Sequence, residues 1–165
     1  MSSSVDSDEP SRRTALTRAV RLRLPHTSAG GERLMMTWDE ATELVKSVEA
    51  AFGAADLAAI AEGFTEDAVA RFADFPELRG RAAIMEFLTA RFARTKCYRL
   101  TKTPRVLMGD LLANSWDASW EDAKTGKAML GRGTEIWQLR DGKVAVWDAT
   151  FNAWEEGGPP TTPVI

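Results

Sequence analysis

The sequence contains a predicted β-hairpin whose two strands read Gly133-Thr-Glu-Ile-Trp-Gln-Leu-Arg140 and Lys143-Val-Ala-Val-Trp-Asp-Ala-Thr-Phe-Asn152. Asp141-Gly142 joins them, and a two-residue turn favours this dipeptide because both residues tolerate positive φ. Toward the N-terminus, Thr125-Gly126 and Gly109-Asp110 interrupt the chain in the same way. The pattern therefore predicts four strands, at 98–108, 111–122, 128–139 and 143–153.

The part of the chain before these strands has helical periodicity. Thr37 and Glu40 form a capping-box pair, and apolar residues follow at helical spacing until Gly53. Further helices are predicted at 57–62 and 81–94, with an irregular piece between them that leads into a short strand around Val69. Helices followed by an antiparallel meander indicate an α+β domain in which the helices cover one face of the sheet.

Length and composition fit one globular domain, since the 165 residues are 44% hydrophobic and 27% charged. We expect this domain to span 37–153. Residues 1–36 are predicted to be a disordered N-terminal extension, and 154–165 a flexible C-terminal tail. The alternative is that the protein begins at Met35 or Met36, in which case the extension lies upstream of the true start.

Charge argues against some partners. The chain has a net charge of −3 although its N-terminal extension carries six arginines, so the remainder is acidic and nucleic acid is not expected as a partner. No apolar run approaches the length that spans a membrane, and the extension is too polar for a signal peptide. We therefore expect a cytoplasmic protein without a membrane partner.

Rare residues restrict the chemistry. The single cysteine, Cys97, excludes an internal disulfide and is predicted to be a buried structural thiol. The single histidine, His26, lies in the extension, which disfavours histidine-dependent nucleophiles and zinc sites. No metal and no cofactor are expected, and acid–base chemistry would rest on Asp, Glu, Lys, Arg or Tyr98, the sole tyrosine.

Counting outward from the three turns predicts which residues share a face of the sheet. The count places Glu135 opposite Asp148 on one side and opposite Trp116 on the other. The face that contains Glu135 then carries a concentration of polar and aromatic side chains: Arg99, Arg105, Asn114, Trp116, Trp120, Trp137, Asp148 and Asn152.

Glu135 and Asp148 are the candidate catalytic residues. Directly opposed on adjacent strands, their Cβ atoms would lie roughly 4.5–5.5 Å apart. Because like charges repel at this distance, one carboxyl must be held protonated, or an arginine (Arg99 or Arg105) must lie between them.

The same face supplies the candidate ligand contacts. Trp116, Trp120 and Trp137 would form the wall of an aromatic cavity for a small molecule, and Asn114 and Asn152 would contact the ligand. A solvated ladder of charges with half-exposed tryptophans is the alternative. In that case Arg99 and Arg105 make ordinary ion pairs and Asn152 caps the strand end.

Several stretches resemble the nuclear transport factor 2-like, or SnoaL-like, superfamily, and in particular a largely bacterial branch of it. They are Phe64-Thr-Glu-Asp67-Ala, Arg79-Gly-Arg81-Ala-Ala-Ile84 with Phe87-Leu88, Tyr98-Arg99-Leu100-Thr-Lys102, Glu135-x-Trp137 and Ala149-Thr-Phe-Asn152. The resemblance covers roughly 37–153. It implies a cone-shaped curved antiparallel sheet with three helices packed on the concave side, a pocket between them, and a homodimer formed through the outer face of the sheet.

The superfamily includes ketosteroid isomerases, polyketide cyclases, limonene epoxide hydrolases and domains that only bind or dimerise. Ketosteroid isomerases carry a tyrosine donor on the first helix, whereas here Tyr98 begins a strand on the opposite predicted face. Two acids bridged by an arginine and a water, as in the epoxide hydrolases, fit Glu135 and Asp148 better. The resemblance thus implies cofactor-free acid–base catalysis on a small hydrophobic molecule; the alternative is a non-catalytic ligand-binding or dimerisation module.

Overall fold

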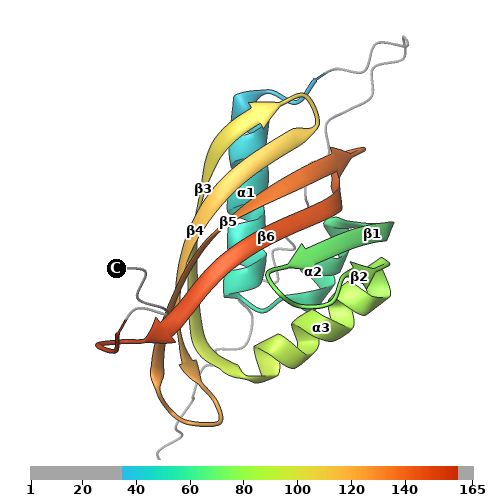
Figure 1. The fold of residues 1–165 in the computed structure, drawn as a ribbon. Coiled ribbons are helices and arrows are strands. Elements are labelled where there is room, and N and C mark those ends of the chain that lie inside the picture. The colour runs from blue at the N-terminus through green and yellow to red at the C-terminus, as the bar shows by residue number, and fades with distance from the viewer. Residues whose placement is uncertain (1–34, 160–165) are drawn as a thin grey trace, which may run out of the picture.

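The structure, a computed structural model, describes residues 35–159 (Figure 1). The predictions made for 1–34 and 160–165 lie outside the described residues. In chain order the elements are α1 (Trp38–Gly53), α2 (Leu57–Glu62), β1 (Phe64–Phe72), β2 (Leu78–Arg79), α3 (Arg81–Ala93), β3 (Thr95–Met108), β4 (Leu111–Asp122), β5 (Ala128–Arg140) and β6 (Lys143–Glu155). Within 35–159, no helix is both long and apolar enough to cross a membrane.

The six strands form one curved sheet in the order β2-β1-β6-β5-β4-β3 (Figure 1). Strands β3 to β6 are the predicted antiparallel meander, and the α+β fold with a curved, unclosed sheet is confirmed. β1 runs parallel to β6, so the complete sheet is mixed. The sequence indicated only a short strand inside β1 and no β2, whose two residues are too few for a periodic pattern.

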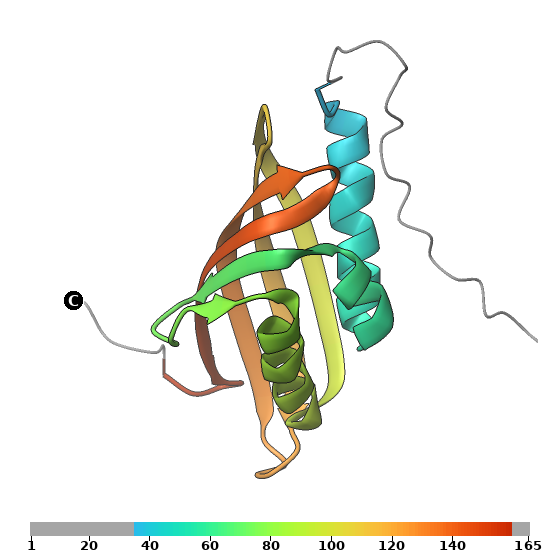
Figure 2. The same ribbon diagram turned by 90° about the vertical axis from the view of Figure 1, so that its right-hand side faces the viewer.

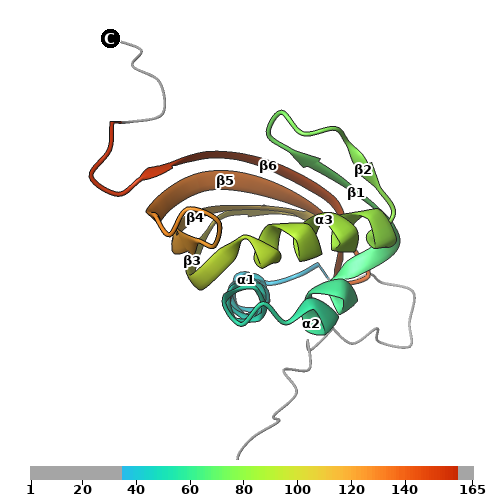
Figure 3. The same cartoon turned by 90° about the horizontal axis from the view of Figure 1, so that it is seen from below.

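All three helices lie on the concave side of the sheet (Figure 3). α1 packs mainly on β3 and α3 mainly on β1, which leaves the two helices at opposite sides of the concave surface (Figure 2). Their contact residues Val45, Ile84 and Leu88 are fully buried. Each such side chain contributes about 1.5–3 kcal/mol relative to exposure, so the helices are held over the sheet by their apolar stripes.

The N-terminus of α1 has the predicted capping box. The Thr37 hydroxyl accepts a hydrogen bond from the Glu40 N–H at 3.3 Å, and the Glu40 carboxylate accepts one from the Thr37 N–H at 2.8 Å. These bonds satisfy two donors that a helix start otherwise leaves free. The cap fixes where α1 begins, and thereby which of its residues face the sheet.

Two β-bulges change the faces of the outer strands of the meander. Across the turns, Met108 pairs with Leu111 and Arg140 with Lys143, as predicted. The register then shifts between Pro104 and Val106 in β3, and between Gln138 and Leu139 where β5 meets β6. One extra residue turns the rest of a strand over. The predicted faces of β3 and β6 are therefore wrong beyond the bulges.

The inner strands keep their predicted faces although their register differs. The loop after β4 is longer than two residues, and Glu121 rather than Lys124 is the last residue before it to pair, with Ala128. This moves the pairing by two positions, so Asn114 and not Trp116 lies opposite Glu135. Because side chains alternate with a period of two, a two-residue shift leaves every side chain of β4 and β5 on its predicted face.

The prediction of a buried thiol is also wrong. Cys97 is exposed and free, and it lies where the register of β3 shifts between Lys96 and Arg99. Its φ of 52° is in the left-handed region, which is uncommon for a residue other than glycine. The irregular backbone turns this side chain out of the ladder, which strand periodicity alone could not predict.

Candidate functional site

The nine predicted site residues separate onto two faces of the sheet. The concave face, which the helices cover, carries five of them: Asn114, Trp116, Trp120, Glu135 and Trp137. The outer face carries the other four: Arg99, Arg105, Asp148 and Asn152. The predicted opposition of the two carboxylates is wrong, because the β6 bulge places Ala149 opposite Glu135 and Ile136 opposite Asp148.

Two of the four outer residues, Asp148 and Arg105, have side-chain contacts on the outer surface. Asp148 accepts from Arg71 Nη1 at 3.2 Å, and Arg71 Nε in turn contacts Glu77 at 2.8 Å. Arg105 donates from Nε to Ser115 Oγ at 2.9 Å. These groups remain in water, so the arginine bridge predicted between Glu135 and Asp148 does not exist here.

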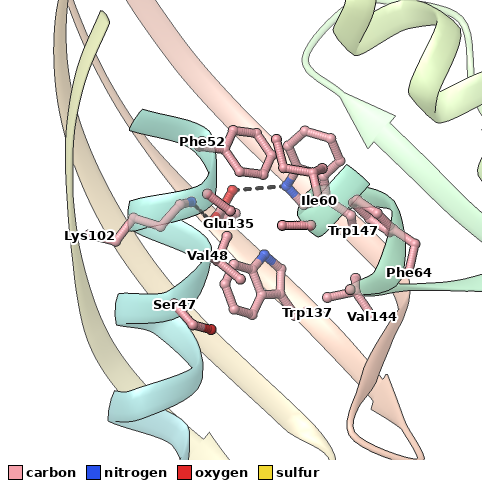
Figure 4. A pocket seen from close by; sticks show the side chains of 13 residues that line it. Ser47, Val48, Phe52, Ile60, Phe64, Lys102, Glu135, Trp137, Val144 and Trp147 are labelled. Carbon is pink, nitrogen blue, oxygen red and sulfur yellow. Dashed lines mark hydrogen bonds and ion pairs between the residues drawn. The ribbon is translucent and has the colours of Figure 1, made fainter. Parts of the chain in front are cut away.

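Glu135 lies inside the cone, with 3% of its surface exposed. Its Oε1 is ion-paired with Lys102 Nζ, and its Oε2 accepts a hydrogen bond from Trp147 Nε1 at 2.8 Å (Figure 4). Lys102 is equally buried, at 4%. The partner of the buried carboxylate is therefore a lysine, not a second carboxylate or an arginine.

Lys102 is held in place by α1. β3 is an edge strand, and the outward N–H of Lys102 donates to Glu49 Oε2 at 2.5 Å. Lys46 Nζ donates to the Lys102 carbonyl at 3.3 Å and pairs with Glu49 at 2.9 Å. An edge strand needs such partners for its free backbone groups. These contacts anchor the backbone from which the Lys102 side chain enters the cone.

The first cavity lies between α1, α2 and the sheet, and Lys102 and Glu135 line it (Figure 4). Its other walls are almost entirely apolar, with contributions from Val48, Phe52, Ile60, Phe64, Trp137 and Trp147. The ammonium of Lys102 lies 5.3 Å from the Trp137 ring centroid, within the range of a cation–π contact. The cavity volume of about 40 Å³ is enough for about one or two water molecules.

A second, smaller cavity of about 20 Å³ lies on the other side of the ion pair, toward α3. Lys102, Glu135, Phe52 and Trp147 line both cavities and so form the partition between them. The second cavity adds Arg91 from the last turn of α3 and Tyr98 from β3. Tyr98 therefore faces the concave side, contrary to prediction.

The hydroxyl of Tyr98 is perturbed by this environment. Burial raises the pKa of Tyr98; the charge of Arg91 and a hydrogen bond to Arg91 oppose the rise, and the negative charge of Glu135 adds to it. Arg91 itself lies over aromatic rings, with Cζ 5.1 Å from the centroid of Phe72 and 5.8 Å from that of Phe151. Two cations and one carboxylate thus line a largely aromatic space.

Asn114 lies next to Glu135 across the ladder and is 1% exposed. Within residues 35–159, neither its amide nitrogen nor its amide oxygen has a hydrogen-bond partner. Leaving such a group unsatisfied costs about 1–3 kcal/mol. A buried amide without partners beside an ion pair is consistent with a polar site built for something besides stability.

The tryptophans of β4 have a strong structural role. The Trp116 ring lies against Gly133 and the Trp120 ring against Gly131: a Cβ at Gly133 would come within 2.7 Å of the Trp116 ring, and one at Gly131 within 2.9 Å of the Trp120 ring. Glycines on the neighbouring strand thus make room for both indoles. Trp116 also lines the second cavity, whereas the Trp120 ring packs near the Tyr98 ring, with 6.3 Å between the ring centroids.

The sequence did not single out Lys102, Arg91, Phe52 or Trp147 as site residues. The available signal for Lys102 was Pro104, because proline inside a strand is typical of edge strands and bulges. A bulge at this position turns Lys102, in place of Arg99 and Arg105, toward the concave side. No group of three or more His, Cys, Asp or Glu side chains that could hold a metal exists among the described residues. Among residues 35–159, the titratable groups that line the two cavities are the carboxylate of Glu135, the ammonium of Lys102, the guanidinium of Arg91 and the phenol of Tyr98.

Comparison with known proteins agrees with this architecture. The SnoaL-like domain family matches residues 44–147. A candidate polyketide cyclase from Xanthomonas campestris pv. campestris has 21% identity, covers 66% of this chain and 87% of that chain, and superposes with a TM-score of 0.61. An LEH-like epoxide hydrolase from M. tuberculosis has 15% identity, covers 69% of this chain and 84% of that chain, and superposes with a TM-score of 0.56.

TerC, co-crystallised with polyporic acid, has 21% identity and covers 68% of this chain and 91% of that chain, with a TM-score of 0.58. No curated protein matches in sequence. At these identities the solved structures establish the fold alone. The family match extends over more than half of the sequence, from α1 to the middle of β6. The chain therefore belongs to the SnoaL-like domain family, with the nuclear transport factor 2-like fold.

Proposed function

We propose that the protein binds a small, largely apolar molecule inside the cone and moves a proton on it with Glu135 and Lys102. One observation carries the proposal: a carboxylate and an ammonium, 3% and 4% exposed, line an apolar cavity. A buried ion pair is poor evidence for stability, because apolar residues of similar volume often replace it without loss. Buried ionisable groups that face a cavity are instead typical of functional sites.

The two groups suit proton abstraction next to a carbonyl. Lys102 would donate a hydrogen bond to the carbonyl oxygen of the ligand, which releases Oε1 of Glu135. Glu135 would then remove the neighbouring carbon-bound proton and return it to another carbon or to the oxygen. Such proton transfer matches the isomerase- and cyclase-type chemistry expected from the resemblance, with a lysine in place of the second carboxylate.

The space for the ligand must be enlarged on binding. A cavity of about 150 Å³ holds benzene in another protein, and the two cavities here measure about 40 and 20 Å³. Phe52 belongs to the partition between them and is only partly buried near the end of α1. Rotation of Phe52 would join both cavities around the ion pair.

A non-catalytic binding module is the second candidate. The observation that favours it is that both oxygens of Glu135 already have donors, from Lys102 and Trp147. A carboxylate held in this way is well placed to orient a ligand and less free to accept a proton. Turnover that survives Glu135→Gln, once a substrate is known, would favour this candidate over the catalytic one.

Binding is tested with a neutral planar probe, benzamide, and protein that contains 5-fluorotryptophan. We expect benzamide to shift the ¹⁹F resonances of Trp137 and Trp147, and not that of Trp38, which is 48% exposed on α1. Ala59→Leu, which fills the first cavity, should abolish these shifts. Ala58→Leu, at the neighbouring exposed position of α2, is the matched control. Equal shifts in both variants would place the probe elsewhere and refute the proposed pocket.

We also propose that the protein forms a homodimer through the outer face of the sheet. Four large apolar side chains are exposed on adjacent strand positions there: Val106, Met108, Leu111 and Ile136. Contiguous apolar surface of this kind is typical of interfaces. Light scattering should give the mass of a dimer for the unsubstituted chain and of a monomer for Ile136→Lys, with the exposed α3 variant Ala90→Lys as control. A monomeric unsubstituted chain would contradict this.

A further inference from the structure

The charges that line the cone do not balance. Lys102 and Glu135 neutralise each other as an ion pair. Arg91 is the remaining charged residue of the second cavity, and among residues 35–159 no carboxylate lies within 4 Å of its guanidinium. Within the described part of the chain, the lining of the second cavity therefore carries one positive charge without an anionic partner.

The surroundings of Arg91 are arranged around its guanidinium. Aromatic rings of Phe72 and Phe151 lie at 5.1 and 5.8 Å from Cζ, and these rings hold the cation without satisfying its N–H donors. The Tyr98 hydroxyl lines the same cavity. A guanidinium and a phenol at one end of an aromatic space offer several hydrogen-bond donors to an incoming oxyanion.

By contrast, Arg94, the C-cap residue of the same helix, has a carboxylate partner outside the cone. Its Nη2 donates to Asp122 Oδ2 at 2.8 Å, and its side chain is exposed. Two arginines three positions apart thus differ in environment: one forms an ordinary surface pair, and the other turns toward the cavity without a carboxylate. Because no carboxylate among residues 35–159 pairs with it, the charge of Arg91 is available to a bound anion.

We propose that the ligand is a small planar monoanion, such as an aromatic carboxylate, whose anionic group binds Arg91 and Tyr98 while its ring lies against Trp147 near Glu135 and Lys102. This inference rests on the proposed function, because it assigns a ligand class to the same interior site. A neutral ligand would leave the guanidinium without a counter-charge, whereas a dianion would exceed the available positive charge. The bound ring would present its substituents to the ion pair in the partition.

The test compares benzoate with benzamide, which share their shape and differ in charge. With the full chain, ¹⁹F titrations should give a dissociation constant at least about tenfold lower for benzoate, equivalent to about 1.4 kcal/mol. Arg91→Gln should remove this preference, so that the dissociation constants of benzoate and benzamide lie within about twofold of each other. Arg94→Gln is the matched control and should keep the preference.

The outcomes separate this inference from the proposed function. If benzamide and benzoate bind equally well at Trp147, the pocket stands and the inference of an anionic ligand is refuted. If the preference for benzoate persists in Arg91→Gln, the assignment of the anion site to Arg91 is refuted. Binding of neither probe by the folded protein overturns both. Loss of the preference in Arg91→Gln alone, with circular dichroism spectra equal among the variants, supports the inference.

Discussion

Two carboxylate–cation pairs lie on opposite faces of the same part of the sheet. The side chains of Glu135 and Lys102 are 2% and 5% exposed inside the cone, whereas the side chains of Asp148 and Arg71 are 45% and 53% exposed outside it. The chemical groups are similar, and Asp148 lies opposite Ile136, the neighbour of Glu135. The two pairs differ in their exposure to water. This exposure determines the free energy that is lost when a pair is broken, and the strength with which its charges act on a bound ligand.

The outer pair is a surface contact worth about 0–1 kcal/mol, because water and salt screen it. The inner pair has lost its hydration and depends on its partner and on Trp147. Breaking such a pair by removing one member leaves a buried charge uncompensated. Chemistry on a ligand requires the inner environment, where a charge acts strongly on a neighbouring group.

The largest expected effect comes from removing the inner cation. Lys102→Met should lower the free energy of unfolding by about 3–5 kcal/mol, because Glu135 is then left buried without its ion-pair partner. Arg71→Met, the same kind of change at the outer pair, should cost no more than about 1 kcal/mol. Urea denaturation measures both. Similar losses in the two variants would show that the pairs do not differ in solvation.

The next largest effect concerns the packing of the concave face. A Cβ at Gly133 would lie 2.2 Å from the Thr150 carbonyl oxygen and 2.7 Å from the Trp116 ring. Gly133→Ala should therefore cost about 2–3 kcal/mol and shift the Trp116 environment. Gly53→Ala, where nothing lies within 4 Å, should leave the stability unchanged or raise it slightly. A neutral Gly133→Ala in the same denaturation experiment would contradict the close approach of indole and strand.

A smaller effect is expected in alkali. The folded state raises the pKa of Tyr98 above about 10, the pKa of a tyrosine in the unfolded chain. Tyr98 therefore contributes stability below about pH 10, and this contribution is lost as the pH rises through the pKa of the folded state. Tyr98 is the only tyrosine, so phenolate absorbance reports it alone. The midpoint should lie above 10 and rise further in Arg91→Gln, which removes the opposing cation. A midpoint at or below 10 in the folded protein would refute its burial.

The sequence contained enough information for the fold and for half of the site. Turn dipeptides, the capping box and apolar periodicity predicted the three helices, the meander and their layering. Glu135, Trp137, Asn114, Trp116 and Trp120 were placed on the concave face because β4 and β5 carry no bulge between them. Local signals sufficed wherever the strand alternation was uninterrupted.

The rest of the site could not be predicted because it depends on two single-residue insertions. Each bulge reverses which side chains of its strand face the helices. Trp147 therefore lies on the concave face where Asp148 was predicted, and Lys102 lies there where Arg99 and Arg105 were predicted. A bulge is fixed by packing across the sheet, and its sequence signals, such as Pro104, are weak. Arg91 and Phe52 enter from helices, and their position over the sheet is a tertiary property.

A pair of double-mutant cycles tests the contrast between the two carboxylates most directly. The inner cycle combines Lys102→Met with Glu135→Leu, and the outer cycle combines Arg71→Met with Asp148→Leu, all measured by urea denaturation. We predict an inner coupling of about 2–3 kcal/mol, with the double variant recovering most of the loss caused by Lys102→Met, and an outer coupling below about 1 kcal/mol. Two equally small couplings would contradict a desolvated Glu135–Lys102 pair inside the cone.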